Sequence, residues 1–191
     1  MNPAFEKGTS PFSTKTLLTL EILSPLPYHL SMITLIKIDD PQDEFLKDMV
    51  YEMVFFADKS KKPPKEELLA IPEISRYYNL FAGHGEGFIA LVDGVRAGAA
   101  WYLNFPLQQK GYGHVKYGVP ELSIAVLEKY RCIGVGTKLM EELINLARKN
   151  GFPGVSLSVD TVNPARRLYE RLGFKLHSID GTSQTMTLDF N

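Results

Sequence analysis

Hydrophobic residues recur along this chain with two different periods, and each period predicts one kind of element. Runs of aliphatic and β-branched residues predict strands, whereas apolar positions spaced three and four residues apart predict helices. An Asp-Gly pair between two strand-like runs is in addition a strong signal for a tight hairpin. Strands are expected at residues 33–38, at 87–105 as two runs around Asp93-Gly94, and at 121–127, 154–160, 174–179 and 184–190.

Four segments have the apolar spacing of a helix. They are residues 39–57, 65–78 with a break at Pro72, about 135–150, and 163–173. The first begins with acidic residues, which complement the positive end of a helix dipole. The third carries a long apolar stripe and stops at Asn150-Gly151. The last is expected to begin with Asn163 as N-cap and Pro164 in its first turn.

Taken in order, these elements predict an α/β (α+β) protein. We expect one mixed, mostly antiparallel sheet of about seven strands with helices on both faces. Nothing indicates a repeat or a second domain, so residues 32–191 are expected to form a single domain. Residues 1–31 have a different pattern, because an apolar piece is interrupted by Glu21 and followed by prolines. We expect a loosely attached extension there, or a start assigned upstream of a natural one at Met32.

Composition and charge exclude several classes of function. The 191 residues are 45% hydrophobic and carry a net charge of −1 without a long basic run, so nucleic-acid binding is not expected. No apolar run approaches the roughly 20 residues that cross a bilayer, so no membrane association is expected. Cys132 is the single cysteine, and the four histidines lack metal-ligand spacing. We therefore expect a cytoplasmic protein without a metal.

Two glycines stand in front of the third expected helix, in the stretch 129-KYRCIGVGTKLM-140. Glycine-rich turns that open a helix often bind phosphate through free backbone amides. A nucleoside-triphosphate loop requires Gly-Lys-Ser/Thr, but here Thr137 follows Gly136 and Lys138 comes after it. A dinucleotide fold requires a third glycine, but Leu139 occupies that position. Both of these alternatives are excluded.

A third interpretation fits the same glycines. The line 121-ELSIAVLEKYRCIGVGTKLM-140 resembles the acyl-CoA-binding core of the GNAT superfamily of N-acetyltransferases, in which [R/Q]-x-x-G-x-[G/A] opens a helix. A second signature of that superfamily, N-x-A-x-x-L-Y-x-x-x-G-F, is similar to 163-NPARRLYERLGF-174. The two signatures occur in the order and at the separation usual for the superfamily. The resemblance covers about residues 32 to 191.

The resemblance implies a set of residues for acetyl-CoA, which would serve as acyl-donor co-substrate. Glycines allow a pyrophosphate to approach the amides of a helix N-terminus closely. The strand before the loop is splayed from its neighbour at a bulge in the superfamily, which frees amides for the pantetheine arm. Cys132 departs from the glycine usual at its position, and a thiol nucleophile would need a base that cannot be located. The implied residues are Ile124, Ala125, Val126, Arg131, Cys132, Ile133, Gly134, Val135, Gly136, Thr137 and Asn163.

Acetyl transfer to an amine also needs an oxyanion donor, a general acid and a general base. The resemblance implies the backbone N–H of Val126 for the oxyanion and the phenol of Tyr169 for the departing thiolate. Tyr169 could also simply pack in the core. Glu121 is the best candidate for the base, although a register shift of one residue would turn it away from the cleft. His114 and Tyr112 are its rivals.

The sequence thus predicts an N-acetyltransferase that acts on a primary amine of a small molecule or a peptide. The alternative is a GNAT-like protein that binds acyl-CoA without turnover. A homodimer is left open. In this superfamily the acceptor cleft is built by the segments that correspond to residues 58–86, 106–120 and 180–183. Their aromatic and basic residues could line such a cleft or belong to ordinary packing, and they are Arg76, Tyr77, Tyr78, Tyr112, Lys116 and Tyr117, with Trp101 nearby.

Overall fold

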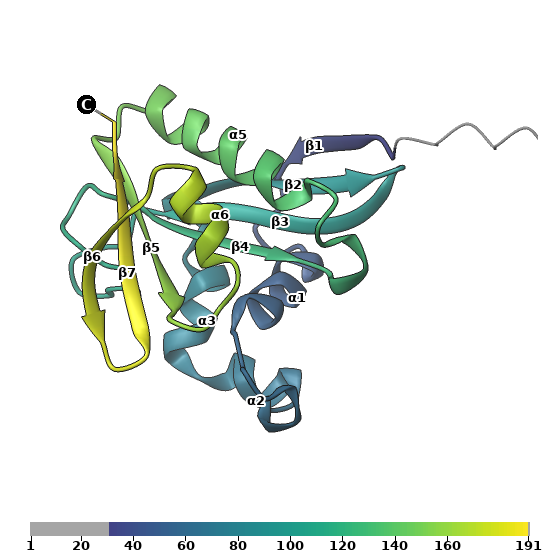
Figure 1. Cartoon of the computed structure of the whole chain (residues 1–191), viewed down its shortest axis with the longest axis horizontal. Coiled ribbons are helices and arrows are strands. Elements are labelled where there is room, and N and C mark those ends of the chain that lie inside the picture. Colours follow the sequence, from purple (N-terminus) through teal and green to yellow (C-terminus); the bar gives the residue numbers. More distant parts are fainter. Residues whose placement is uncertain (1–30, 191) are drawn as a thin grey trace, which may run out of the picture. The chain divides into compact units, whose positions relative to one another are not determined.

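Seven strands form one mixed sheet in the computed structural model, which describes residues 31–190 (Figure 1). The strand order is β1-β2-β3-β4-β5-β7-β6. Neighbouring strands are antiparallel except for β4 and β5, which run parallel. The predicted fold class is therefore confirmed. The strands are β1 (Ile33–Lys37), β2 (Gly85–Val92), β3 (Val95–Leu103), β4 (Glu121–Val126), β5 (Gly154–Asp160), β6 (Lys175–Asp180) and β7 (Ser183–Asp189).

Helices lie on both faces of this sheet (Figure 1). Helices α5 and α6 pack on one face, and α1, α2 and α3 pack on the other. The helices are α1 (Glu44–Met53), α2 (Lys65–Ala70), α3 (Pro72–Asn79), α4 (Phe81–His84), α5 (Val135–Lys149) and α6 (Arg166–Arg171), with short 3₁₀ turns at Lys59–Lys61 and Glu128–Tyr130. The break predicted at Pro72 separates α2 from α3, because proline is accepted in the first turn of a helix but not in its interior.

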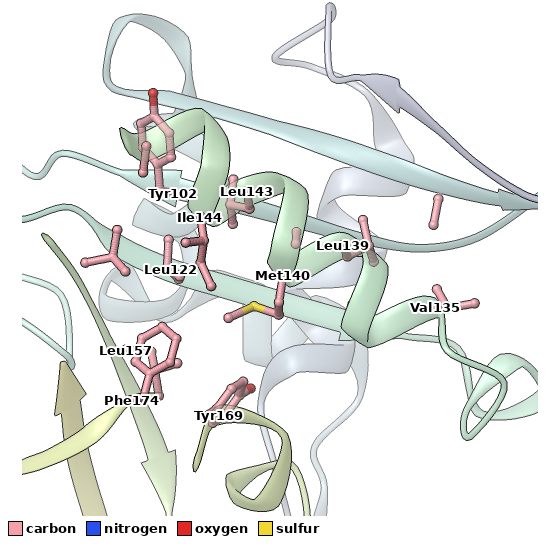
Figure 2. Close-up of a cluster of buried hydrophobic side chains, with 14 of the residues drawn as sticks. Tyr102, Leu122, Val135, Leu139, Met140, Leu143, Ile144, Leu157, Tyr169 and Phe174 are labelled. Atoms are coloured by element: carbon pink, nitrogen blue, oxygen red, sulfur yellow. The ribbon is translucent and has the colours of Figure 1, made fainter. Parts of the chain in front are cut away.

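Each face of the sheet has its own hydrophobic core. On the α5 face, the apolar stripe of α5 packs against Leu122, Leu157 and Phe174 from three different strands and loops (Figure 2). On the α1 face, α1 and α3 cover Trp101, which is fully buried. Because successive side chains of a strand point to opposite faces, the central strand β4 contributes to both cores. The fold thus fixes which face each residue of β4 serves.

The Asp93-Gly94 turn joins β2 to β3 as predicted. Both residues have positive φ, 50° at Asp93 and 82° at Gly94, which matches the twist of a two-residue hairpin. The predicted boundaries of two helices were wrong. Helix α1 begins only after Asp43, whose side chain accepts the Phe45 N–H and caps it, so residues 39–43 and 54–57 lie outside it. Helix α6 begins at Arg166 and not at Pro164.

Two sequence-based expectations concern the ends and the surroundings of the domain. The extension expected at residues 1–31 lies, apart from Ser31, outside the described residues. Within residues 31–190, no helix has both the length and the apolar composition needed to cross a membrane.

Candidate active site

Strands β4 and β5 meet at one end and then separate. Glu121 lies opposite Ser156, and the Ser156 N–H donates to the carbonyl of Pro120 at 3.0 Å. Beyond this pair, no further residues of the two strands are in register within the described part of the chain, whereas β4 stays paired with β3 up to Val126. Figure 1 shows the two strands diverging. The edge of β4 that faces β5, at residues 123–126, is therefore without a paired strand among residues 31–190, and we call this open edge the groove.

The backbone of β4 presents amides to this groove. The Leu127 N–H donates to the Ala97 carbonyl of the neighbouring segment at 2.9 Å. Backbone groups alternate between the two sides of a strand, so the amides of Ile124 and Val126 point away from β3 and toward the groove. The resemblance implied a bulge in β4, but the pairing of β4 with β3 is continuous and shows no register shift. In the described residues such shifts lie between Ala90 and Leu91 and between Leu176 and Ser178. The groove arises from divergence of the strands.

Helix α5 begins at the open end of the same groove. Gly134 is its N-cap with φ of 94°, a left-handed conformation that favours glycine. The first intrahelical bond runs from the Lys138 N–H to the Gly134 carbonyl at 3.0 Å, so the amides before Lys138 have no acceptor within the helix. A Cβ atom on Gly136 would lie 3.5–3.9 Å from side chains of Leu168, Val126 and Ile124. The free amides thus adjoin the groove, an arrangement that could hold an anion with an extended tail.

Arg131 folds back over the end of β4. Its Nε donates to the Val126 carbonyl at 2.9 Å, and its Nη2 lies 3.8 Å from a carboxylate oxygen of Glu52. These contacts tie the loop before α5 to the end of β4 and to α1. The neighbouring Cys132 is exposed and has φ of 62°, also in the left-handed region. This explains why glycine is usual at its position, since a side chain is strained there.

Asn163 and Tyr169 come from the segment that follows β5. The Asn163 side chain accepts the Ala165 N–H at 2.9 Å and its carbonyl accepts the Arg166 N–H, so it caps a tight first turn before α6. The ring of Tyr169 is buried in the core on the α5 face, where its centroid lies 6.0 Å from that of the Phe174 ring (Figure 2). Burial raises the pKa of Tyr169 to about 12. The phenol therefore keeps its proton at neutral pH.

Glu121 is buried on the opposite face of β4, where it meets α3. Its Oε1 accepts a hydrogen bond of 2.7 Å from the Tyr77 hydroxyl, and its Oε2 is buried without a partner of ordinary geometry in the described structure. Burial raises the pKa of Glu121 to about 7. The Tyr77 hydroxyl, the Gly113 amide and the Arg76 charge favour the carboxylate but do not outweigh burial. The side chain of Glu121 therefore lies on the sheet face that α1 and α3 cover.

Of the other candidates, Tyr112 and Trp101 contact Tyr77, the partner of Glu121. The ring of Tyr112 stacks on that of Tyr77 with centroids 6.3 Å apart, and it is largely exposed. His114 is half-buried, and burial together with Lys110 lowers its pKa. Trp101 belongs to the core and donates to the Tyr77 carbonyl. The contact of Tyr77 with Glu121 was missed from the sequence, because the two residues are 44 positions apart and no local pattern links them.

Comparison with known proteins decides the family. The sequence profile of the Acetyltransferase (GNAT) family matches residues 48–174, a range that holds both glycine and tyrosine motifs. This chain belongs to that family. An N-alpha-acetyltransferase from Sulfurisphaera tokodaii is 36% identical over 121 residues, covering 56% of this chain and 69% of the relative. A Xenopus tropicalis protein named "Probable N-acetyltransferase camello" is 40% identical over 58 residues, and the match spans 30% of this chain and 26% of that relative.

Solved structures of the family share the fold. The PaiA N-acetyltransferase from Thermoplasma acidophilum in complex with coenzyme A has a TM-score of 0.56 at 20% identity, covering 83% of this chain and 99% of that one. A GNAT acetyltransferase from Staphylococcus aureus Mu50 has a TM-score of 0.60 at 14% identity, covering 84% and 100%. The resemblance inferred from the two motifs is confirmed, and the expected class, an acetyl-CoA-dependent acyltransferase, is confirmed at the level of the family.

Proposed function

We propose that this protein is an N-acetyltransferase that moves an acetyl group from acetyl-CoA to a primary amine by direct attack of the amine on the thioester. The observation that carries the proposal is the groove between β4 and β5, which opens onto the N-terminus of α5. The backbone amides of β4 could bind the pantetheine arm of CoA, and the free amides at the start of α5 could bind its pyrophosphate.

The donor end of the site is supported by the loop before α5. The amides of Val135, Gly136 and Thr137 would bind the pyrophosphate, and the glycines at 134 and 136 would let it approach. Arg131 would hold the loop through its bond to Val126, with Cys132 and Ile133 completing the turn. The strand residues Ile124, Ala125 and Val126 would flank the pantetheine arm, and Asn163 would contact the same arm.

In the transfer step, the N–H of Val126 would donate to the thioester oxygen as negative charge develops on it. Tyr169 would donate its phenolic proton to the departing sulfur. Its pKa of about 12 keeps the proton on the phenol at neutral pH, so a donor is present when the carbon–sulfur bond breaks. Its place in the core does not oppose the role, since packing fixes the ring and only the hydroxyl needs to reach the groove.

Glu121 would take the proton that the amine must lose. An amine of lysine type has a pKa of about 10.4 and is mostly protonated at neutral pH, so a base is required. A carboxyl group with a pKa of about 7 is matched to that task near neutral pH. Since its oxygens are buried in the present arrangement, the loop 106–120 above it would have to shift to admit the acceptor or a bridging water.

The name of the Sulfurisphaera tokodaii relative makes the α-amino group of peptides the first acceptor to test. The experiment incubates the protein with acetyl-CoA and a panel of amines: peptides with free N-termini, free lysine and small polyamines. Release of CoA reports turnover, and isothermal titration calorimetry measures the binding of acetyl-CoA in parallel. Turnover with any amine above the rate of hydrolysis supports the proposal. Tight binding without transfer to any amine would instead favour the binding-only alternative, and absence of binding would refute both.

A further inference from the structure

The hydroxyl of Tyr77 makes two hydrogen bonds that join three separate segments. It donates to Glu121 Oε1 of β4 at 2.7 Å and accepts the backbone N–H of Tyr112 at 2.9 Å. The Tyr77 residue is 3% exposed, and its ring lies edge-on to Phe105 with centroids 5.4 Å apart. Its own carbonyl accepts the indole N–H of Trp101. Both ends of Tyr77 are therefore fixed, and its hydroxyl has little freedom to choose other partners.

The loop 106–120 lies directly over the carboxyl group that Tyr77 holds. A Cβ atom on Gly111 would overlap Glu121 Oε2, and one on Gly113 would lie 2.6 Å from the Leu157 carbonyl carbon of β5. Arg76 ties the same loop to α3, since its Nη1 donates to the Lys110 carbonyl at 2.6 Å. Two adjacent residues of α3 thus connect this loop to the helix, one through Lys110 and the other through Tyr112.

We propose that Tyr77 is a positioning residue that orients the carboxylate of Glu121 and couples it to the loop 106–120 above it. The predicted effect of Tyr77 on turnover rests on the proposed function. Its predicted effect on the titration of Glu121 does not. A phenylalanine would fill the same space in the core. The hydroxyl is needed because, among residues 31–190, Glu121 would otherwise have no side-chain donor for its charged form.

The electrostatic surroundings of Glu121 support this role. Burial and the adjoining carboxylate raise the pKa of Tyr77 well above its ordinary value, so its hydroxyl remains a donor throughout the working range of pH. Of the charged or titratable groups, Tyr77 and Arg76 of α3 act on Glu121, and Tyr112 of the loop acts on Tyr77. Lys110 of the same loop acts on His114. The paired strand residues, Leu103 and Ser156, do not titrate. Tyr77 is the side-chain donor that bonds Glu121 directly.

The test compares wild type with Tyr77→Phe and follows Glu121 by NMR of ¹³C-labelled glutamate carboxyls against pH. Glu121→Gln identifies the resonance by its loss. A hydrogen bond to a carboxylate favours its ionised form, so its removal should raise the titration midpoint of Glu121 by about one pH unit or more. The matched control is Tyr78→Phe, which removes a hydroxyl from the next residue of α3. An unchanged midpoint in Tyr77→Phe would overturn the proposal.

A second measurement examines the loop in the same variants. Hydrogen exchange of the Tyr112 amide should become at least about tenfold faster in Tyr77→Phe, since this amide loses its acceptor. Exchange at the wild-type rate would contradict the coupling to the loop. Because both measurements need no substrate, they test Tyr77 even if the wild type transfers no acetyl group.

The kinetic consequence applies once turnover is established. The acid limb of kcat/KM should move to higher pH in Tyr77→Phe in parallel with the midpoint of Glu121, so the deficit at pH 7 should largely disappear at pH 9. Tyr78→Phe should keep the wild-type profile. A uniform loss at all pH values would show that Tyr77 serves packing alone and would reject the positioning role.

Discussion

Glu121 of β4 lies directly opposite Ser156 of β5, and in the described structure this is the one pair at which the two parallel strands are in register. The pair closes the groove at the start of β4. The other end of β4 leads through a short loop into the N-terminus of α5. An acyl donor bound at that terminus would therefore extend along β4 toward Glu121. The proposed anion site and the proposed base lie at the two ends of this one strand.

Two glycines of the loop should respond differently to substitution, because Gly136→Ala should stabilise the free protein and still allow CoA to bind, whereas Gly134→Glu should abolish CoA binding. Gly136 is the second residue of α5, where alanine is favoured over glycine, and the new methyl group would make only ordinary contacts. The free protein should gain up to about 1 kcal/mol in unfolding free energy. Binding of CoA should be retained, because the family motif accepts alanine at this position and the methyl group would contact the side chains of Leu168, Val126 and Ile124. Gly134→Glu should instead abolish binding, because it places a carboxylate beside the proposed pyrophosphate site and strains a residue with φ of 94°.

Thermal unfolding with and without CoA checks both effects together. A ligand at 100 times its dissociation constant adds about 2.7 kcal/mol, which is several degrees for a domain of this size. The control is Gly151→Ala, a glycine at the other end of α5 with positive φ, which should lower the stability but keep the shift caused by CoA. A full CoA shift in Gly134→Glu would argue against the assignment of the loop.

Tyr169→Phe should lower turnover by about 10²-fold or more and leave CoA affinity nearly unchanged, because only the acid is removed. The ring stays in the core, so the melting temperature should change little. Steady-state kinetics and calorimetric CoA binding are the measurements. Tyr130→Phe is the control, since this tyrosine lies in the turn before the cofactor loop. Wild-type turnover in Tyr169→Phe would remove Tyr169 from the role of general acid.

Glu121→Gln should make the protein relatively more stable as pH rises. The pKa of Glu121 is raised from 4.5 to about 7 in the folded state, so the folded form favours the neutral carboxyl. The resulting stabilisation is complete below pH 4.5 and is lost as pH rises through 7. This shift corresponds to a change on the order of 3 kcal/mol in the wild type, and the glutamine variant lacks it.

Denaturant unfolding at pH 5 and pH 8.5 gives the comparison. The difference in unfolding free energy between Glu121→Gln and wild type should shift in favour of the variant at the higher pH. Glu66→Gln removes the same charge from an exposed position of α2 and serves as the control. If both variants respond to pH alike, Glu121 does not carry the shifted titration.

Local sequence patterns predicted the strands of the sheet, and the two motifs indicated the family. The hairpin at Asp93-Gly94 is determined by neighbouring residues, since an Asp-Gly pair readily adopts positive φ. Helix ends were less predictable. Asn163 does bind the Ala165 N–H, but the Arg166 N–H bonds the Asn163 carbonyl three residues back, so the first turn is tighter than an α-helix.

Long-range contacts in the site could not be read from the chain. The bond between Tyr77 and Glu121 depends on α3 packing against the end of β4. The separation of β4 from β5 likewise depends on strands whose nearest ends, Val126 and Gly154, are 28 positions apart in sequence (154 − 126). Only the family resemblance suggested it, and that resemblance placed a bulge where the described strand has none.

Cys132 provides a test of backbone strain in the cofactor loop. Its φ of 62° is costly for a residue with a side chain, by roughly 1–2 kcal/mol. Glycine removes that strain, although it also increases the freedom of the unfolded chain. Cys132→Gly should therefore be at least as stable as wild type. Cys132→Val should be the least stable of the three, because β-branched residues tolerate positive φ worst.

The comparison of Cys132→Gly with Cys132→Val isolates the conformation, since the cysteine is exposed and neither variant empties a buried site. The two melting temperatures should differ by about 2–6 °C. Cys132→Gly should also keep the shift produced by CoA, which would exclude the thiol from binding and from covalent chemistry. If Cys132→Val melts together with Cys132→Gly, the loop relaxes without cost and the left-handed conformation of residue 132 does not determine its stability.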